Sequence, residues 1–374
     1  MSSGPRPKLK GRRGSADGPP MSAITELDST EEVVHDAFEM PTRTDRAAVL
    51  LERMGIGPLA RRIGLWKGIL VLNYHRMGSP DGTGFARDLW SATAEDFDAH
   101  LRMLKRNFDV VSPGDLLDRP YTRRRRVVLT FDDGYRDSYD IALPALRRHG
   151  LPATFFVVPG FVDDPGVAWW DDIAWMVDQA PVGTLPIPEH GLADIELGGP
   201  ISRDDASTLL AHVYKGLPGG RTNDFLDLLA ERTGAGRCPP ELGADLWMSW
   251  DQVRELRDEG MTIGGHSLTH PVLARLDHHA QAHEIDACAE RLREELGIDM
   301  EFFSYPVGLD DAYDLTTREL LEQAGVRLAF AYTGGYSDRT IADPMAVPRA
   351  SVAHTMSITR FAARLTAPQL FARW

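Results

Sequence analysis

The chain has 374 residues but only two cysteines, Cys238 and Cys288. Two cysteines are too few for a disulfide framework, which excludes the class of small secreted scaffolds stapled by disulfides. The sequence also has no run approaching the ~20 consecutive apolar residues of a membrane-spanning helix. We therefore expect two free thiols and no transmembrane segment.

The N-terminus lacks the apolar segment of a secretory signal peptide. Lys8, Lys10, Arg12 and Arg13 resemble the basic start of such a peptide, but no apolar stretch follows them. The sequence therefore predicts a cytoplasmic protein.

Positive charge is scarce, because acidic residues outnumber basic ones and give a formal net charge of −14. A nucleic-acid partner is not expected, since phosphate binding needs a net basic face. The hydrophobic share of 43% and the charged share of 26% are those of a globular protein. The length suits one large α/β barrel or two ordinary domains, and it leaves the oligomeric state open.

The chain divides into a tail and one large folded domain. Residues 1–43 are rich in glycine, proline, serine and charge, which is typical of a disordered tail. Residues 44–374 form the predicted domain, which begins with a helical pattern. Short apolar runs such as 69–72 and 127–131 then alternate with helical segments such as 94–106 and 138–149. Repeated strand–helix units predict a parallel sheet, either open or closed into a barrel.

One segment interrupts this alternation, from about residue 163 to 246. It contains Trp169 and Trp170, several prolines and glycines, and helical pieces. We interpret it as an inserted subdomain at the carboxyl end of a strand, where insertions line the active-site face. The two tryptophans could stack on sugar rings or pack the core of the insertion, and the sequence does not separate these alternatives.

Polar residues follow several of the predicted strands directly: His75, Asp132 with Asp133, His266, and Ser304. The carboxyl ends of parallel strands meet at one edge of a sheet, where ligands bind. Two adjacent carboxylates there repel each other unless a cation or a shared proton is present. We therefore expect one of them to contact a metal and the other to face a substrate.

The segment from His266 to His270 supplies two imidazoles four residues apart. On a helical turn this spacing would place both rings on one face. Two histidines and one carboxylate form a hydrolytic metal set that leaves positions open for water and substrate. The sequence therefore predicts a divalent metal site.

These motifs resemble those of the polysaccharide deacetylases, the NodB-homology family of carbohydrate esterases. The first family motif corresponds to residues 130–134, Thr-Phe-Asp-Asp-Gly, and the second to residues 266–270, His-Ser-Leu-Thr-His. A looser third motif corresponds to residues 304–308, Ser-Tyr-Pro-Val-Gly. The resemblance covers about residues 68–365, apart from the insertion.

The resemblance implies a distorted, seven-stranded (β/α) barrel of the TIM-like kind and a metal that is usually zinc. It assigns Asp132 as the general base. It assigns Asp133, His266 and His270 as the metal ligands. It also implies that Tyr305 and Pro306 of the third motif contact the substrate.

Two departures from the family pattern stand out. The third motif usually begins with an arginine that orients the base, and here Ser304 takes that position; Arg349 is the candidate replacement. A late histidine that usually supplies the general acid is not evident. The sequence therefore resembles the exopolysaccharide-type branch, in which an early strand ending in Tyr-His supplies it, and His75 is the candidate.

The resemblance predicts a hydrolase that removes N-acetyl groups from an amino sugar in a polysaccharide or its precursor. The expected partner is accordingly an N-acetylated glycan or oligosaccharide. Two alternatives remain open: the same metal site acting on a formamide or cyclic imide, and a non-catalytic carbohydrate-binding relative. An intact Asp132 argues against the second alternative, since a binding module needs no base.

Overall fold

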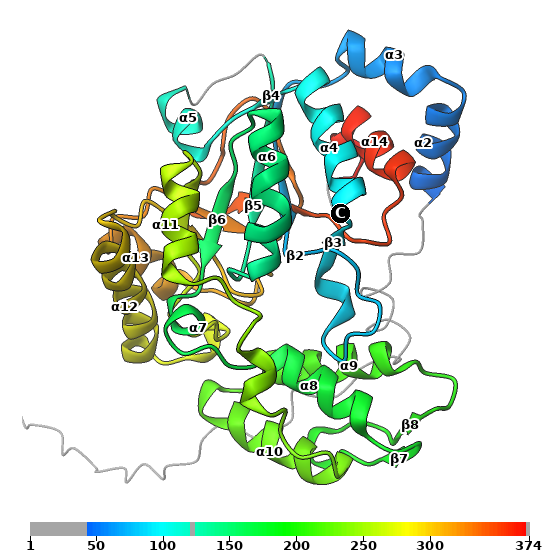
Figure 1. Cartoon of the computed structure of the whole chain (residues 1–374), viewed down its shortest axis with the longest axis vertical. Helices are drawn as coiled ribbons and strands as arrows, with labels where there is room; N and C mark the ends of the chain where they lie inside the picture. The colour runs from blue at the N-terminus through cyan, green and yellow to red at the C-terminus, as the bar shows by residue number, and fades with distance from the viewer. Residues whose placement is uncertain (1–42, 120–123, 372–374) are drawn as a thin grey trace, which may run out of the picture.

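The structure is a computed structural model that describes residues 43–119 and 124–371. The predicted disordered tail lies outside the described residues except for its last residue, Arg43, where helix α2 (Arg43–Arg53) begins. The chain forms a barrel surrounded by helices, with a further helical unit at one end (Figure 1).

The barrel wall consists of seven parallel strands among the described residues. In spatial order they are β1 (Gly68–Tyr74), β5 (Arg125–Phe131), β6 (Thr154–Val157), β9 (Thr262–Gly265), β10 (Phe302–Ser304), β11 (Leu328–Ala331) and β13 (Val347–Pro348). Arg349 separates β13 from β14 (Ala350–Ser351), and β14 pairs in parallel with β1. This last segment therefore bridges β11 and β1 and closes the sheet, as the predicted distorted (β/α) barrel requires.

Shorter strands extend this sheet and form two small ones. Strand β12 (Tyr336–Ser337) pairs antiparallel with the start of β1, and β4 (Asp109–Val110) pairs with β5. Strands β2 (Arg76–Met77) and β3 (Trp90–Ala92) pair with each other, as do β7 (Gly183–Leu185) and β8 (Ile195–Leu197).

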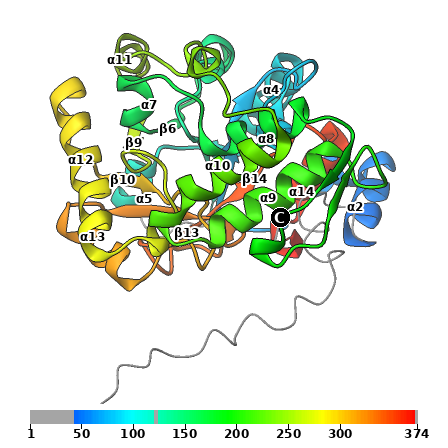
Figure 2. The same cartoon turned by 90° about the horizontal axis from the view of Figure 1, so that it is seen from below.

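Helices cover the outside of the barrel (Figures 1 and 2). They are α3 (Ile56–Ile63), α4 (Ala94–Asn107), α5 (Pro113–Asp118), α6 (Leu143–His149) with a preceding π-helical turn (Ser138–Ala142), α7 (Pro159–Asp163), α11 (Trp250–Asp258), α12 (His278–Leu296), α13 (Leu315–Gln323) and α14 (Ile358–Thr366). Their ends carry local signals. Asp277 caps the first turn of α12 by accepting the Ala280 N–H, and Gly297 ends it with φ 67°. None of these described helices is long and apolar enough to cross a membrane.

Side chains alternate across each strand, so the barrel has an inner and an outer core. Val128 of β5 packs inside the barrel with Ile69, Phe156 and Phe330. Its neighbour Leu129 packs outside, against the surrounding helices. Continuing the alternation past the end of β5 directs Thr130 and Asp132 inward, so the strand itself positions the first acidic residue.

The predicted insertion contains a helical unit with its own hydrophobic core. Its helices are α8 (Trp169–Gln179), α9 (Arg203–Gly216) and α10 (Thr222–Thr233), accompanied by β7 and β8. Ile173, Leu210 and Phe225 are among the residues buried between them. Figures 1 and 2 show this unit across the end of the barrel to which β6 leads. The limits at 163 and 246 stay a prediction.

Candidate metal centre and active site

Two carboxylates follow β5 at the carboxyl end of the barrel. Asp132 is 1% exposed and Asp133 is 3% exposed. Asp133 adopts φ 70°, a left-handed conformation that is strained for a residue with a side chain. This turn separates the directions of two adjacent carboxylates, so that each can contact a different partner.

Asp133, His266 and His270 form a cluster that fits a metal ion. His266 Nε2 lies 3.3 Å and His270 Nε2 lies 3.5 Å from Asp133 Oδ1, and the candidate ligand atoms all lie within 4.8 Å of one another. Atoms bound tetrahedrally to zinc at about 2.0–2.1 Å lie roughly 3.3 Å apart. The three ligands predicted from the sequence therefore have the spacing of a metal set.

The segment that carries the two histidines is a loop. The expectation of a helical turn is wrong, because Ser267 and His270 have φ 59° and 61°. Ser267 Oγ accepts the His270 N–H at 3.0 Å, and Glu284 of α12 accepts the Thr269 N–H at 2.8 Å. These contacts fix the loop without helical hydrogen bonds and still turn both rings toward Asp133.

The orientation of the His266 ring is fixed by a hydrogen bond at the ring nitrogen that does not face Asp133. Its Nδ1 donates to the Ser304 carbonyl oxygen at 2.7 Å, which directs Nε2 at Asp133. His270 Nδ1 is buried and has no hydrogen-bond partner among the described residues. Burial and the neighbouring His266 lower the pKa of His270 to about 3. A neutral imidazole is the form that binds a metal.

Asp132 lies in a buried network with the arginine that the sequence suggested as a replacement. Arg349 Nη1 donates to Asp132 Oδ1 at 2.8 Å and to Asn73 Oδ1 at 2.8 Å. Arg349 Nη2 donates to Ser304 Oγ at 2.8 Å, and this hydroxyl donates to Asp132 Oδ2 at 3.1 Å. The guanidinium thus reaches the Asp132 carboxylate from the last barrel strand, while Ser304 adds a hydroxyl at the position where the resemblance led us to expect an arginine.

Both carboxylates are ionised despite their burial. Burial alone would raise the pKa of Asp132, but the Arg349 guanidinium and then His266 more than offset it and lower the pKa. Burial opposes ionisation of Asp133 too, and the hydrogen bond to His266 with the nearby histidines lowers its pKa. Asp132 and Asp133 are thus negatively charged, and the Arg349 guanidinium lies beside Asp132.

His75 stands at the same edge of the barrel. Its Nε2 lies 3.2 Å from the Tyr332 hydroxyl, and the two rings are stacked with centroids 6.2 Å apart. Tyr332 also contacts the Asn73 amide and the Arg349 guanidinium. Asn73 and Tyr332 were missed in the sequence. A polar Asn73 in an otherwise apolar strand was the available signal, whereas Tyr332 had none.

The two tryptophans of the insertion have different surroundings. The Trp170 ring contacts the His270 ring edge to face, with centroids 4.6 Å apart. Its Nε1 donates to the Tyr135 hydroxyl at 2.7 Å, which donates to Asp171 Oδ2 at 3.0 Å. Trp169 instead stacks on Tyr214 at 4.1 Å. Both rings are thus engaged in packing, and Trp170 packs directly against a predicted metal ligand.

Tyr305 does not face the site. It follows Ser304 on β10, so the alternation of the strand turns its side chain outward into the helical core. It is 0% exposed, stacks on Tyr313 at 3.9 Å and donates to the Met345 carbonyl oxygen. This placement corrects the expectation that its side chain contacts the substrate. Pro306 is buried next to it.

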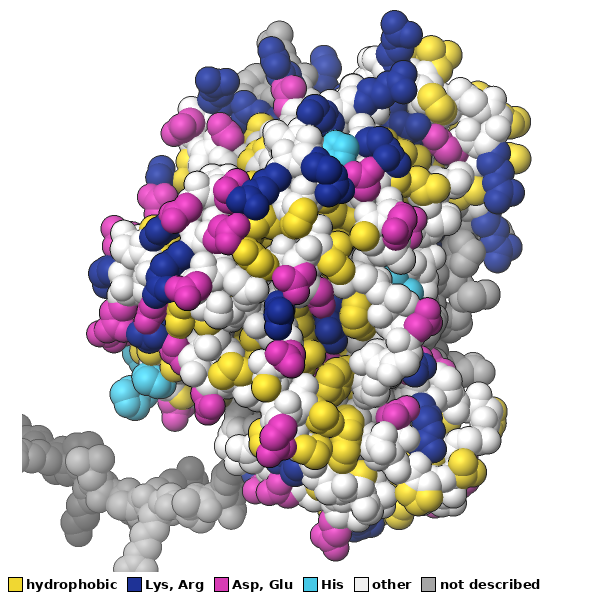
Figure 3. Space-filling view, in the orientation of Figure 1, with side chains coloured by type: hydrophobic (Ala, Val, Ile, Leu, Met, Phe, Trp, Pro, Cys, Tyr) yellow, Lys and Arg dark blue, Asp and Glu magenta, His cyan; other side chains and the backbone are white. Residues whose placement is uncertain are grey.

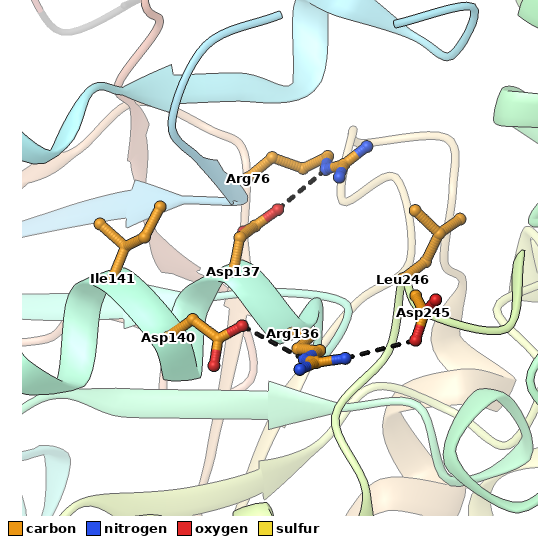
Figure 4. Close-up of a pocket in the computed structure, with 7 residues that line it drawn as sticks. All are labelled: Arg76, Arg136, Asp137, Asp140, Ile141, Asp245 and Leu246. Atoms are coloured by element: carbon orange, nitrogen blue, oxygen red, sulfur yellow. Dashed lines mark hydrogen bonds and ion pairs between the residues drawn. The ribbon is translucent and has the colours of Figure 1, made fainter.

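A surface pocket of about 240 Å³ lies beside the site and is separate from it. Arg76, Asp137, Arg136, Asp140 and Asp245 line it together with Ile141 and Leu246, and ion pairs join the charged residues (Figure 4). No residue of the predicted metal set lines this pocket. Arg76 links this pocket to the site. Its guanidinium lies 4.7 Å from the centroid of the Tyr135 ring, and Tyr135 accepts the hydrogen bond from Trp170, which packs against His270.

The polysaccharide deacetylase family model matches residues 119–187 and 217–329 of this chain. The chain therefore contains a polysaccharide deacetylase domain. The matched segments include the Asp132–Asp133 turn and the 266–270 loop, and the unmatched residues between them include β8 and α9 of the insertion. The family is one of deacetylases, which agrees with the enzyme class predicted from the sequence.

Individual relatives are distant. The putative polysaccharide deacetylase YxkH of Bacillus subtilis (strain 168) is 24% identical over 181 residues, which are 44% of this chain and 61% of that protein. The chain thus matches less than two thirds of the length of this relative.

Two solved deacetylases share the fold. The structure of Streptococcus pyogenes deacetylase PplD in complex with acetate has a TM-score of 0.51 at 18% identity and covers 82% of this chain and 98% of its own. IcaB from Ammonifex degensii has a TM-score of 0.50 at 20% identity, with coverage of 80% and 98%. At these identities the comparison establishes the barrel fold alone.

Proposed function

We propose that this polysaccharide deacetylase is a divalent-metal-dependent hydrolase that removes N-acetyl groups from an amino sugar in a polysaccharide or its precursor. One observation carries the proposal: Asp133, His266 and His270 converge at one buried point, and His266 Nε2 lies 3.8 Å from Asp132 Oδ2. A metal set beside a second, separately oriented carboxylate suits hydrolysis of an amide.

We propose zinc as the metal, because two imidazoles and one carboxylate are a common zinc ligand set that leaves a position open. When bound, such an ion supplies Lewis acidity toward the acetyl carbonyl oxygen and lowers the pKa of water. Asp133, His266 and His270 would hold the ion through the Oδ1 and Nε2 atoms that face one another.

Asp132 is the proposed general base. Arg349 occupies its Oδ1, while Oδ2 faces His266 and the metal set. Its lowered pKa keeps the carboxylate ionised at neutral pH, ready to accept a proton from an attacking water. Arg349 and Ser304 are positioning residues in this scheme, since Arg349 fixes Oδ1 and the Ser304 hydroxyl donates to Oδ2 at 3.1 Å.

His75 is the proposed general acid. Amide hydrolysis needs a proton delivered to the leaving nitrogen, because an amine anion is too basic to depart unaided. The Tyr332 hydroxyl orients the His75 ring at the mouth of the same strand ends. Imidazole side chains commonly serve as general acids in enzymes.

We assign the chain to the exopolysaccharide-type branch because residues from other parts of the barrel replace the two residues that are missing from the usual motifs. Arg349 reaches Asp132 from the last barrel strand. His75 follows Tyr74 at the end of the first barrel strand. The substrate would then be an acetylated glycan longer than a single sugar. Trp170 would form the wall behind His270 and not a platform for a sugar ring.

Acetate release from N-acetylglucosamine oligomers tests the proposal. Protein treated with a chelator should lose activity, and added zinc should restore it. Asp132→Asn should stay inactive after zinc is added. Hydrolysis of a formamide or a cyclic imide in place of these oligomers would favour the alternative amide substrates. Oligomer binding without acetate release in zinc-loaded protein would favour a binding relative.

A further inference from the structure

The helical pair α2 and α3 exposes an unusual apolar surface. Thirteen large hydrophobic side chains are exposed among the described residues, and seven of them lie between positions 50 and 65. We call these seven the α2–α3 apolar face: Leu50, Leu51, Met54, Ile56, Leu59, Ile63 and Leu65. Singly exposed apolar residues are normal, but a cluster of this kind marks an interaction site.

The apolar side chains of helix α3 face solvent, which is the reverse of a helix that covers a core. Ile56, Leu59 and Ile63 recur at intervals of three and four residues and are 46%, 59% and 69% exposed. The buried residues of the helix are Gly57 and Arg61. A helix that covers a core turns its apolar stripe inward. Here the stripe faces outward, so the packing of α3 does not account for it.

A buried arginine fixes this arrangement. Arg61 is 5% exposed, and its guanidinium donates to both carboxylate oxygens of Glu52 at 2.6 and 2.7 Å. It also donates to the Ala362 carbonyl oxygen at 2.9 Å and to Thr366 Oγ1 at 2.8 Å, both on α14. These contacts join α2, α3 and the barrel-covering α14. The apolar face is therefore the fixed outer surface of a packed unit.

The exposed charged side chains of residues 46–67 are basic. Arg46, Arg53, Arg62 and Lys67 are exposed, and the one acidic residue between positions 46 and 67, Glu52, is paired with Arg61. The chain as a whole has a formal charge of −14. Figure 3 shows dark-blue basic and yellow hydrophobic side chains together over α2 and α3 at the upper right. This corner is thus a local basic and apolar surface on an acidic protein.

We propose that α2 and α3 dock this protein on an anionic lipid bilayer. Exposed leucines and isoleucines would enter the boundary between headgroups and acyl chains, and the flanking arginines would contact anionic headgroups. The chain runs from α3 into the amino end of β1, whereas Asp132 and His266 follow the carboxyl ends of their strands. The docked barrel would therefore direct its metal centre away from the lipid. This inference does not depend on the proposed catalytic function.

Co-sedimentation of the full chain with lipid vesicles tests the proposal. We expect binding to vesicles of mixed phosphatidylcholine and phosphatidylglycerol and much weaker binding to phosphatidylcholine alone. Leu59→Ser/Ile63→Ser should weaken binding by at least about tenfold through lost apolar burial. Arg53→Gln/Arg62→Gln should weaken it by about fivefold per charge removed, the equivalent of ~1 kcal/mol each.

A matched control comes from exposed residues elsewhere. Val182 and Leu315 are both 75% exposed and lie outside α2 and α3, so Val182→Ser/Leu315→Ser should bind vesicles like the unaltered chain. Circular dichroism should show every variant folded. The proposal is overturned if the folded full chain ignores anionic vesicles, or if the control variant loses as much binding as Leu59→Ser/Ile63→Ser. It is also overturned if sedimentation without lipid shows a dimer that Leu59→Ser/Ile63→Ser dissociates, because a second copy would then cover the face.

Discussion

Replacing Arg349 with methionine removes the guanidinium that touches the proposed base. Arg349 and Asp132 are 1% exposed each, and the guanidinium makes hydrogen bonds of 2.8 Å to Asp132, Asn73 and Ser304. Loss of one partner leaves a buried charge without compensation, which typically lowers the free energy of unfolding by about 3–5 kcal/mol. Misplacement of the base should lower kcat/KM by roughly 10²-fold as well.

The pH dependence separates this electrostatic role from a merely structural one. In the unaltered protein the lowered pKa of Asp132 gives a stability contribution that is present above its unfolded pKa and lost only as pH falls through the folded pKa. In Arg349→Met, burial still disfavours the charged Asp132 carboxylate, but the guanidinium that stabilised this charge is gone. The folded pKa of Asp132 should therefore rise above the ordinary value. The free energy of unfolding then falls as pH rises from the unfolded pKa of Asp132 to this raised folded pKa. The difference in Tm between variant and parent, both metal-depleted, should grow from pH 5 to pH 8, and the acid limb of kcat/KM should move toward neutral pH.

A volume-conserving exchange of two residues tests whether Asp132 needs an arginine at position 349 or only a guanidinium beside its carboxylate. Arg349→Ser/Ser304→Arg moves the arginine to the position that the family usually gives it, and Ser304 Oγ already lies 2.8 Å from the Arg349 guanidinium. The exchange should recover part of the activity that Arg349→Ser loses. Arg318→Met is the control, since the Arg318–Asp343 pair is 31% and 41% exposed and contributes ~0–1 kcal/mol. An unchanged acid limb in Arg349→Met would refute the reasoning.

The remaining predictions concern the base, the acid and the two tryptophans. Asp132→Asn should retain stoichiometric zinc by elemental analysis and lose about 10²–10⁴-fold in acetate release; a near-normal rate would assign the base elsewhere. His75→Ala should slow hydrolysis of an N-acetyl sugar much more than that of an ester with a good leaving group, and equal losses on both would remove it as the acid. Trp170→Ala should weaken zinc binding by roughly 10–100-fold in a chelator competition, because the ring supports His270, whereas Trp169→Ala should leave it unchanged. The same zinc affinity in both tryptophan variants would contradict the support that we infer.

The strand ends were the part of the fold that the sequence predicted best. Several short apolar runs are followed directly by a polar residue, and β1 and β5 end within two residues of their predicted limits. A largely apolar run extends from Ala346 to Val352. It is interrupted at Arg349, where it passes from β11 to β1. Closure of the barrel came from the family resemblance, because alternating strands and helices alone also suit an open sheet.

The site was predictable where its chemistry lies within a short motif and unpredictable where separate elements meet. Asp132, Asp133, His266 and His270 were found because adjacent carboxylates and paired imidazoles at strand ends are seldom required for packing alone. The contact of Trp170 with His270 depends on how the insertion folds over the barrel, which no local pattern records. Tyr305 is a different case: an inward Ser304 requires an outward Tyr305 on a strand, so the alternation of side chains could have corrected that expectation.

The most direct test of the metal centre combines metal content with activity in one set of samples. Purified protein, protein depleted by a chelator, and depleted protein reloaded with zinc would each be analysed for bound metal and for acetate release from N-acetylglucosamine oligomers, beside His266→Ala/His270→Ala. We predict about one zinc per chain in the active samples, none in the inactive ones, and neither zinc nor activity in the double variant. Full zinc occupancy or undiminished acetate release in His266→Ala/His270→Ala would contradict the assignment of this cluster as the metal centre.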